Sequence, residues 1–292
     1  MLTPDLKWSN RIVDFERRHP GRFVNTGISE QNMITMAAGM ATFGHVPYVA
    51  GFASFIGLLC AEQIRTDLAY PELPVRVLAH HTGISLGFYG TSHHATEDLA
   101  FMRSIAGLTV ICPCDAAALT KALWDTVDRP GPIYFRIGRG RDQDVYGPDA
   151  SRFEVGKLSV LRDGTDLVII ANGVTVAPAL EAAAQLEQAG VSAAVADAHT
   201  IRPFDADTFC AIASEVGRVL VAEEHNVIGG VASACADALV DRGVDHVVLK
   251  RLGVPDEYAP IGPPTRLYEH YHLDAAGILK ESQELLAMRQ RR

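Results

Sequence analysis

Short runs of apolar and β-branched residues alternate with longer amphipathic stretches through the first half of the chain. The runs VPYVAGF, VRVLAHH, TVICPC and IYFRIG have the length and composition of strands, and the stretches between them, such as SFIGLLCAEQIRTDLA, have helical periodicity. Asp115 stands directly before AAALTKALWDTVD, where its side chain is suited to cap a helix. Strands that alternate with helices predict a mostly parallel sheet with helices on both faces.

The alternation lapses at GRGRDQDVYGPDASRFEVG, where Gly, Pro and Asp accumulate. We therefore place a linker near residues 141–160. A second alternation runs from DLVIIANG to HVVLKRLG and is followed by a helix that begins at about Ala275. The prediction is an α/β protein with two doubly wound, mostly parallel-sheet domains, residues 1–145 and residues 160–292, each with its own core.

Three loops that follow predicted strands of the first domain hold unusual residues. They are the turn before Glu30 at the mouth of a helix, the GFASF turn (residues 51–55), and HHTGISLGFYGTSHH (residues 80–94). Open parallel sheets bind ligands at the carboxyl ends of their strands, so we expect the chemistry in these loops. The second domain has Ala-rich helices and few clustered polar groups, and we assign it to structure and assembly.

Each loop also has an ordinary structural explanation. A Glu in the first turn of a helix complements the helix dipole, which is worth about 0.3–1 kcal/mol, and Phe52 and Phe55 have a spacing common in cores. Four histidines in one loop suggest a metal site. However, no carboxylate stands at the spacing of an H-E-x-x-H pattern, and a Gly-rich loop is a poor scaffold for tetrahedral coordination. We predict no metal site built from this chain alone.

Charge and composition narrow the class of protein. The net charge of -9 argues against a nucleic-acid partner, and the one basic cluster, residues 136–142, is too short for such a footprint, although it suits a small anion. No apolar run has the length of a membrane span, and the start MLTPDLKWSN lacks the order of a signal peptide, so we expect a cytoplasmic protein. The odd count of five cysteines fits reduced thiols, and Cys112 and Cys114 are interpreted as a strand end rather than a metal clip.

Several motifs, in order, resemble a known family. NTGISEQNMITMAAGMATFG, GFASF, HHTGISLGFYGTSHHATEDLAFMRSI, ICPCDAAAL, GPIYFRIGR and AEEHNVIGGVASACADAL resemble the pyrimidine-binding and C-terminal domains of transketolase, over nearly the whole chain. The resemblance implies thiamine diphosphate as cofactor. It also implies that Glu30, in the GI-x-E motif, hydrogen-bonds the aminopyrimidine ring and enforces the imino tautomer that removes the thiazolium proton. Such a charge-assisted bond in a dry cleft is worth about 1.5–3 kcal/mol.

The resemblance assigns two further groups at the cofactor. Phe52 and Phe55 match the aromatic wall that stacks on the aminopyrimidine ring, where an offset pair adds about 0.5–1.5 kcal/mol beyond burial. His93 matches the family histidine that contacts the carbonyl-side oxygens of the donor and shuttles protons near neutral pH. Glu30 and His93 are therefore the predicted catalytic residues.

The resemblance also implies a substrate site. His81, Arg139 and Ser9 fall where transketolases hold the terminal phosphate of a sugar, and an Arg is suited to a bidentate grip on that group. Tyr89 stands where sugar-using members carry an acidic residue that binds a donor hydroxyl. Because a phenol is bulkier and neutral, we expect a donor that differs from the usual ketose phosphates.

One half of the family pattern is missing. No GDG with a downstream Asn, the family's magnesium and diphosphate site, occurs in the sequence, and the strand and helix that begin full-length members are also lacking. The resemblance therefore implies that an N-terminal-half, diphosphate-binding subunit holds Mg²⁺ and the charged end of the cofactor. We expect a heterotetramer with two copies of each subunit, and activity only in that complex.

Three other functions are compatible with the motifs. They are the beta subunit of a 2-oxo acid dehydrogenase, a 1-deoxyxylulose-phosphate-synthase-like enzyme, and a non-catalytic assembly subunit. The GISEQNM form and the position of Arg139 favour transketolase over the dehydrogenase subunit. The joint presence of Glu30, Phe52, Phe55 and His93 with that arginine argues against a subunit that has lost its chemistry.

Overall fold

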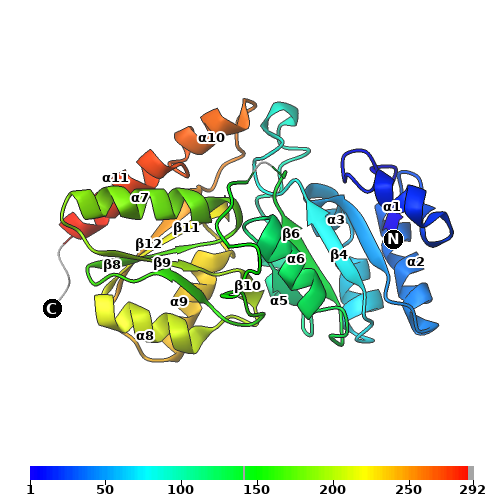
Figure 1. Cartoon of the computed structure of the whole chain (residues 1–292), viewed down its shortest axis with the longest axis horizontal. Helices are drawn as coiled ribbons and strands as arrows, with labels where there is room; N and C mark the ends of the chain where they lie inside the picture. Colours follow the sequence, from blue (N-terminus) through cyan, green and yellow to red (C-terminus); the bar gives the residue numbers. More distant parts are fainter. Residues whose placement is uncertain (141, 289–292) are drawn as a thin grey trace.

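The computed structural model describes residues 1–140 and 142–288, which form two sheets lying side by side (Figure 1). The first sheet has the order β10-β5-β6-β4-β3-β1-β2, and all its neighbouring strands are parallel except β10 and β5. Its strands are β1 (Leu2–Thr3), β2 (Val24–Asn25), β3 (Tyr48–Phe52), β4 (Arg76–His80), β5 (Thr109–Ile111), β6 (Ile133–Ile137) and β10 (Thr200–Arg202).

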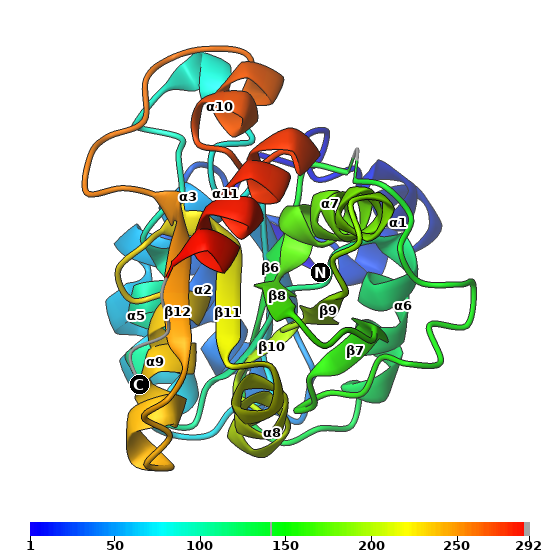
Figure 2. The same cartoon turned by 90° about the vertical axis from the view of Figure 1, so that its left-hand side faces the viewer.

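The second sheet has the order β12-β11-β8-β9-β7, which Figure 2 shows from one edge to the other. Only β7 runs antiparallel to its neighbour. The strands are β7 (Ser159–Arg162), β8 (Leu167–Ala171), β9 (Ala193–Asp197), β11 (Arg218–Asn226) and β12 (Val248–Val254). The predicted class, α/β with two doubly wound and mostly parallel sheets, is confirmed.

Helices cover both faces of the first sheet because its strands alternate their side chains between the two faces. In β4, Val77 packs with α2, α3 and α5, whereas Leu78 lies in the apolar cluster that includes α6. The elements of this half are α1 (Val13–Arg18), α2 (Glu30–Thr42), α3 (Ala53–Leu59), α4 (Ala61–Gln63), a π-helix (Ile64–Ala69), α5 (Asp98–Ser104) and α6 (Ala116–Asp125), with 3₁₀ turns at Pro20–Arg22 and Gly87–Tyr89.

The second sheet is covered in the same way. Helices α7, α10 and α11 pack on one face, and α8 and α9 pack on the other (Figure 1). Their bounds are α7 (Val176–Gln188), α8 (Ala206–Val216), α9 (Val231–Asp241), α10 (Pro264–His270) and α11 (Ala275–Ala287), with a 3₁₀ turn at Gly173–Thr175. The predicted start of the last helix at Ala275 is therefore confirmed.

The two halves share their cores, which the sequence analysis did not predict. Each of the two apolar clusters contains residues from both sheets. Strand β10 crosses from the second half to pair with β5, and the Arg202 side chain donates a hydrogen bond to the Arg103 carbonyl oxygen over 2.6 Å. The expectation of separate cores was wrong, because three residues of β10 extend the first sheet across the boundary.

Asp115 fastens both a helix and the predicted linker. Its Oδ1 accepts a hydrogen bond from the Ala118 N–H over 2.7 Å, which confirms the predicted helix cap. Its Oδ2 accepts from the N–H groups of Val145 and Tyr146, each over 2.7 Å. The chain after β6 therefore packs against the protein, and Phe153 there is buried. Residue 141, where the proposed linker begins, and residues 289–292 at the end of the second predicted domain lie outside the described residues.

Candidate active site

The loops after β3 and β4 bring four aromatic rings together. Phe52 ends β3 and Phe55 lies in the first turn of α3, with their ring centroids 5.8 Å apart. His93 approaches both rings, at 5.3 Å from Phe55 and 6.1 Å from Phe52. Tyr89 lies 4.8 Å from His93 and is 62% exposed. Residues assigned to the cofactor and to the donor therefore form one cluster.

The cluster leaves a nitrogen of His93 available to a ligand. Ser92 Oγ lies 2.9 Å from His93 Nδ1, and the His93 ring is half-buried. Within the described residues no hydrogen bond engages Nε2 of this ring. That nitrogen can therefore exchange a proton with, or hydrogen-bond to, a group placed against the aromatic cluster.

Glu30 is the first residue of α2, as predicted, and is half-buried. Gln31 Nε2 donates a hydrogen bond to the Leu59 carbonyl oxygen over 2.9 Å, so the start of α2 lies at the end of α3. Burial, and after it the negative charge of Glu30, raises the pKa of Cys60 to about 12. Across the described residues the Glu30 carboxylate makes no hydrogen bond or ion pair, and no contact joins it to the aromatic cluster.

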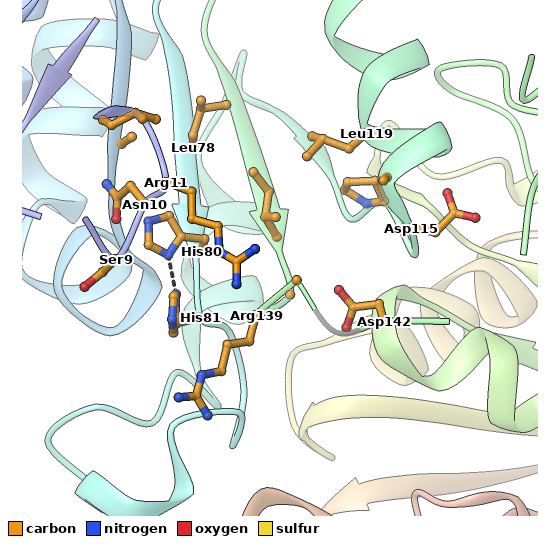
Figure 3. A pocket seen from close by; sticks show the side chains of 17 residues that line it. Ser9, Asn10, Arg11, Leu78, His80, His81, Asp115, Leu119, Arg139 and Asp142 are labelled. Atoms are coloured by element: carbon orange, nitrogen blue, oxygen red, sulfur yellow. Dashed lines mark hydrogen bonds between the residues drawn. The ribbon is translucent and has the colours of Figure 1, made fainter. Parts of the chain in front are cut away.

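A cavity of about 290 Å³ lies at the carboxyl ends of β4 and β6 (Figure 3). Ser9 and Arg11 line it from the segment before α1, His80 and His81 from the end of β4, and Arg139 from the loop after β6. The structure thus gathers all three residues assigned to the terminal phosphate, although they are far apart in the sequence. His81 also joins this cavity to the aromatic cluster, because its ring lies 4.8 Å from Phe52.

The charge in this cavity comes from the two arginines. The Nδ1 atoms of His80 and His81 lie 2.5 Å apart, so one donates and the other accepts. Burial and then the neighbouring His81 lower the pKa of His80 to about 3, and burial followed by Arg139 and Arg11 lowers that of His81 to about 4. Both histidines are therefore neutral near pH 7, and Arg11 and Arg139 make this end of the cavity suitable for an anion.

The family models agree with this geometry. The model described as "Transketolase, pyrimidine binding domain" matches residues 1–142, and "Transketolase, C-terminal domain" matches residues 156–278. One of the two subunits of the apulose-4-phosphate transketolase of Phocaeicola vulgatus is 36% identical over 98% of this chain and 90% of its own length. This chain belongs to the transketolase family.

Other relatives show which part of a transketolase this chain corresponds to. The putative transketolase C-terminal section of Methanocaldococcus jannaschii is 36% identical over 97% of this chain and 89% of its own length. A solved structure described as "Split gene transketolase, inactive beta4 tetramer" superposes with a TM-score of 0.90 at 37% identity, covering 99% of this chain and 93% of that one. The predicted resemblance to the C-terminal half, as in the small subunit of a split transketolase, is confirmed.

Two transketolase-family residues in the cavity have unusual backbone conformations. Arg11 and His81 adopt left-handed φ angles of 53° and 58°. For residues other than Gly this conformation costs about 1–3 kcal/mol and persists only where the surroundings enforce it, most often at functional sites. The sequence analysis missed Arg11 and left His80 without a role. The available signal was that Arg11 follows Ser9 by two residues.

The basic cluster at residues 136–142 divides between two roles. Arg136 is a buried structural residue, whose Nε donates to Asp98 Oδ2 over 3.0 Å with both side chains almost fully enclosed. Arg139 faces the anion cavity, so the predicted suitability for a small anion applies to it alone. Arg141 of the cluster lies outside the described residues.

Cysteine and metal chemistry have no visible place in this transketolase fold. All five cysteines are free and buried, and burial raises the pKa of Cys112 to about 12. Among residues 1–140 and 142–288, no three His, Cys, Asp or Glu side chains are grouped so that they could hold a metal ion. No helix of this part of the chain is both long and apolar enough to cross a membrane.

Proposed function

We propose that this chain is the pyrimidine-binding and C-terminal subunit of a two-subunit, thiamine-diphosphate-dependent transketolase. The complex transfers a two-carbon ketol unit from a ketose donor with a terminal anion, such as a ketose phosphate, to an aldehyde acceptor. A separate N-terminal-half subunit supplies the site for Mg²⁺ and the diphosphate group. The assembly is a heterotetramer with two copies of each subunit.

One observation carries this proposal. Ser9, His81 and Arg139 converge in a single cavity, and the His81 ring also lies 4.8 Å from Phe52 of the aromatic cluster. A ligand with a planar ring at one place and an extended, anionic chain at the other fits this continuous arrangement. A transketolase cofactor together with a sugar phosphate has that shape.

The side chains of this subunit fit the cofactor's pyrimidine ring. The Glu30 carboxylate is half-buried and makes no hydrogen bond within the described residues, so it is an acceptor without an internal partner. Phe52 and Phe55 are half-buried and present ring surface for stacking. When bound, thiamine diphosphate supplies the nucleophilic carbon that takes up the two-carbon unit.

The chain's own residues would then divide the remaining work. Glu30 accepts a hydrogen bond from the ring and fixes its tautomer, and Phe52 and Phe55 orient the ring. His93 Nε2 hydrogen-bonds to the donor and moves a proton at its carbonyl-side oxygen. Arg139 and the neutral His81 bind the terminal anion, which holds the sugar in line with the aromatic cluster.

Tyr89 adapts the site to its donor. Its ring stacks near His93 at 4.8 Å and its side chain is largely exposed, so its hydroxyl can reach a substrate but carries no charge. We expect Tyr89→Asp to change the ranking of donors in the assembled enzyme. An unchanged ranking over a panel of ketose phosphates would contradict this role.

The names of the relatives support a partner subunit. The Phocaeicola vulgatus protein is named as one subunit of its transketolase, and the superposed split-gene structure is an inactive tetramer of beta chains. The test is co-expression with a diphosphate-binding transketolase subunit, followed by a ketol-transfer assay on the purified complex and on each chain alone. Turnover only by the complex supports the proposal, and turnover by this chain alone contradicts it.

A second function has direct support from sequence. The 1-deoxy-D-xylulose-5-phosphate synthase 1 of Geobacter sulfurreducens is 35% identical over 94% of this chain, which spans 43% of that enzyme. The same complex should therefore be assayed for formation of 1-deoxy-D-xylulose 5-phosphate. Formation of that product without ketol transfer would replace the transketolase assignment.

A further inference from the structure

The second half of the chain sends one buried carboxylate to the loop that carries His81. Glu224 lies on β11 and is 1% exposed. Its Oε1 accepts a hydrogen bond from the Ile84 N–H over 3.0 Å and another from the Tyr268 hydroxyl over 2.7 Å. The side chain therefore links β11 and α10 of one half to the loop after β4 of the other.

Gly83 makes this close approach possible. A Cβ atom at Gly83 would overlap Cδ of Glu224, and the residue has a left-handed φ of +55°. Gly83 also exchanges two backbone hydrogen bonds with Ala95, over 3.1 and 2.8 Å. The base of the loop is thus held by its own bridge on one side and by the Glu224 carboxylate on the other.

The loop residues next to this contact belong to the anion cavity. Ser85 follows Ile84, and its carbonyl oxygen accepts a hydrogen bond from Arg139 Nη1 over 3.3 Å. His81 precedes Ile84 by three residues and is held in its left-handed conformation. A shift of the Ile84 backbone would therefore displace both the Arg139 guanidinium group and the His81 ring.

The contact itself is firmly placed. The backbone carbonyl oxygen of Glu224 accepts a hydrogen bond from Arg136 Nη2 over 2.9 Å, and the Asn226 N–H donates to the Thr96 carbonyl oxygen over 2.8 Å. Burial raises the pKa of Glu224 to about 7, with Asp142 adding to the rise and with Arg136 and the hydrogen bonds from Tyr268 and Ile84 opposing it. A carboxylate in such a dry position is costly unless its hydrogen bonds are required.

We propose that Glu224 is a positioning residue for the anion subsite. By holding the Ile84 N–H and the Tyr268 hydroxyl, it fixes residues 81–85 so that His81 and Arg139 meet the terminal anion of the substrate. This inference rests on the proposed function and gives the second half of the chain a part in substrate binding. The assignment of that half to structure and assembly alone is then incomplete.

The first measurement uses inorganic sulfate as the probe, because sulfate keeps its charge across neutral pH. Sulfate is titrated into the full chain and the His81 ring resonances are followed by NMR, with the assignment made through His81→Gln. We expect Tyr268→Phe and Glu224→Gln to weaken sulfate binding about 3- to 10-fold, as for the loss or weakening of one hydrogen bond.

The chain provides a matched control. Tyr271 also donates its hydroxyl to a glutamate, Glu257 Oε1, over 3.0 Å, but this pair does not contact the loop after β4. Tyr271→Phe should therefore leave the sulfate affinity unchanged. In the assembled enzyme, Tyr268→Phe should raise KM for a phosphorylated ketose by the same 3- to 10-fold, with kcat and the KM for the unphosphorylated ketose unchanged.

The outcomes separate the two proposals. Equal sulfate affinity in wild type, Tyr268→Phe and Glu224→Gln would overturn the positioning role and leave the proposed function intact. Equal losses with both the phosphorylated and the unphosphorylated ketose would show a general structural role and also overturn it. No sulfate-dependent shift in the wild type would overturn both the positioning role and the assignment of this cavity to an anion.

Discussion

Replacement of Arg139 by Ala should separate substrate binding from catalysis. Folding uses little of the hydrogen-bonding capacity of this side chain, because its one hydrogen bond in the described part of the chain is a 3.3 Å contact to the Ser85 carbonyl oxygen. A charge-assisted hydrogen bond to a phosphate is worth about 1.5–3 kcal/mol. The variant should therefore raise KM for a phosphorylated donor about 10- to 150-fold. Arg11 remains in the cavity, so binding should weaken rather than disappear.

The assay is steady-state ketol transfer by the assembled complex, with a ketose phosphate and the same ketose without phosphate. KM for the unphosphorylated donor and the melting temperature should stay close to those of the wild type. Arg139→Lys keeps the charge but loses the bidentate geometry, so it should lie between the wild type and the Ala variant. Equal changes in KM for both donors, or none for either, would refute the assignment of Arg139 to the terminal anion.

Three further changes test the surrounding structure. Asp98→Ala leaves the buried Arg136 without its 3.0 Å partner, so urea unfolding should show a loss of about 3–5 kcal/mol; a loss below about 1 kcal/mol would contradict that burial. Gly83→Ala places a Cβ against the Glu224 carboxylate, so it should lower the melting temperature and weaken sulfate binding, and unaltered values would argue against the close contact. The pKa of His80 is lowered to about 3 in the folded protein, so the unfolded chain binds more protons as pH falls below 6.5. The wild type should therefore lose more stability than His80→Gln between pH 6.5 and pH 4, and equal losses in urea unfolding would contradict this.

Local patterns predicted most of the fold. The runs VPYVAGF and VRVLAHH became β3 and β4 because buried parallel strands need continuous apolar residues. Asp115 capped α6 because an N-cap requires only a side-chain oxygen near the first turn. The short strands β7 and β10 and helix α10 were not predicted, because three or four residues carry too little periodicity and α10 contains several polar side chains.

The site was predictable only where a family motif marked it. The motifs led to Ser9, His81 and Arg139, and the fold brings these residues into one cavity. Arg11 and Glu224 belong to no motif considered in the sequence. Their roles depend on a left-handed turn and on a contact between residues 84 and 224, and neither is encoded in local periodicity.

The central claim is that this chain binds half of a thiamine cofactor and needs a partner for the other half. The most direct measurement is calorimetric titration of thiamine diphosphate and Mg²⁺ into the co-purified complex and into this chain alone. The account predicts binding by the complex, none by the chain alone, and strongly weakened binding or cofactor activation in the complex with Glu30→Ala. A correctly folded complex that binds no cofactor would contradict the account and favour a non-catalytic assembly subunit.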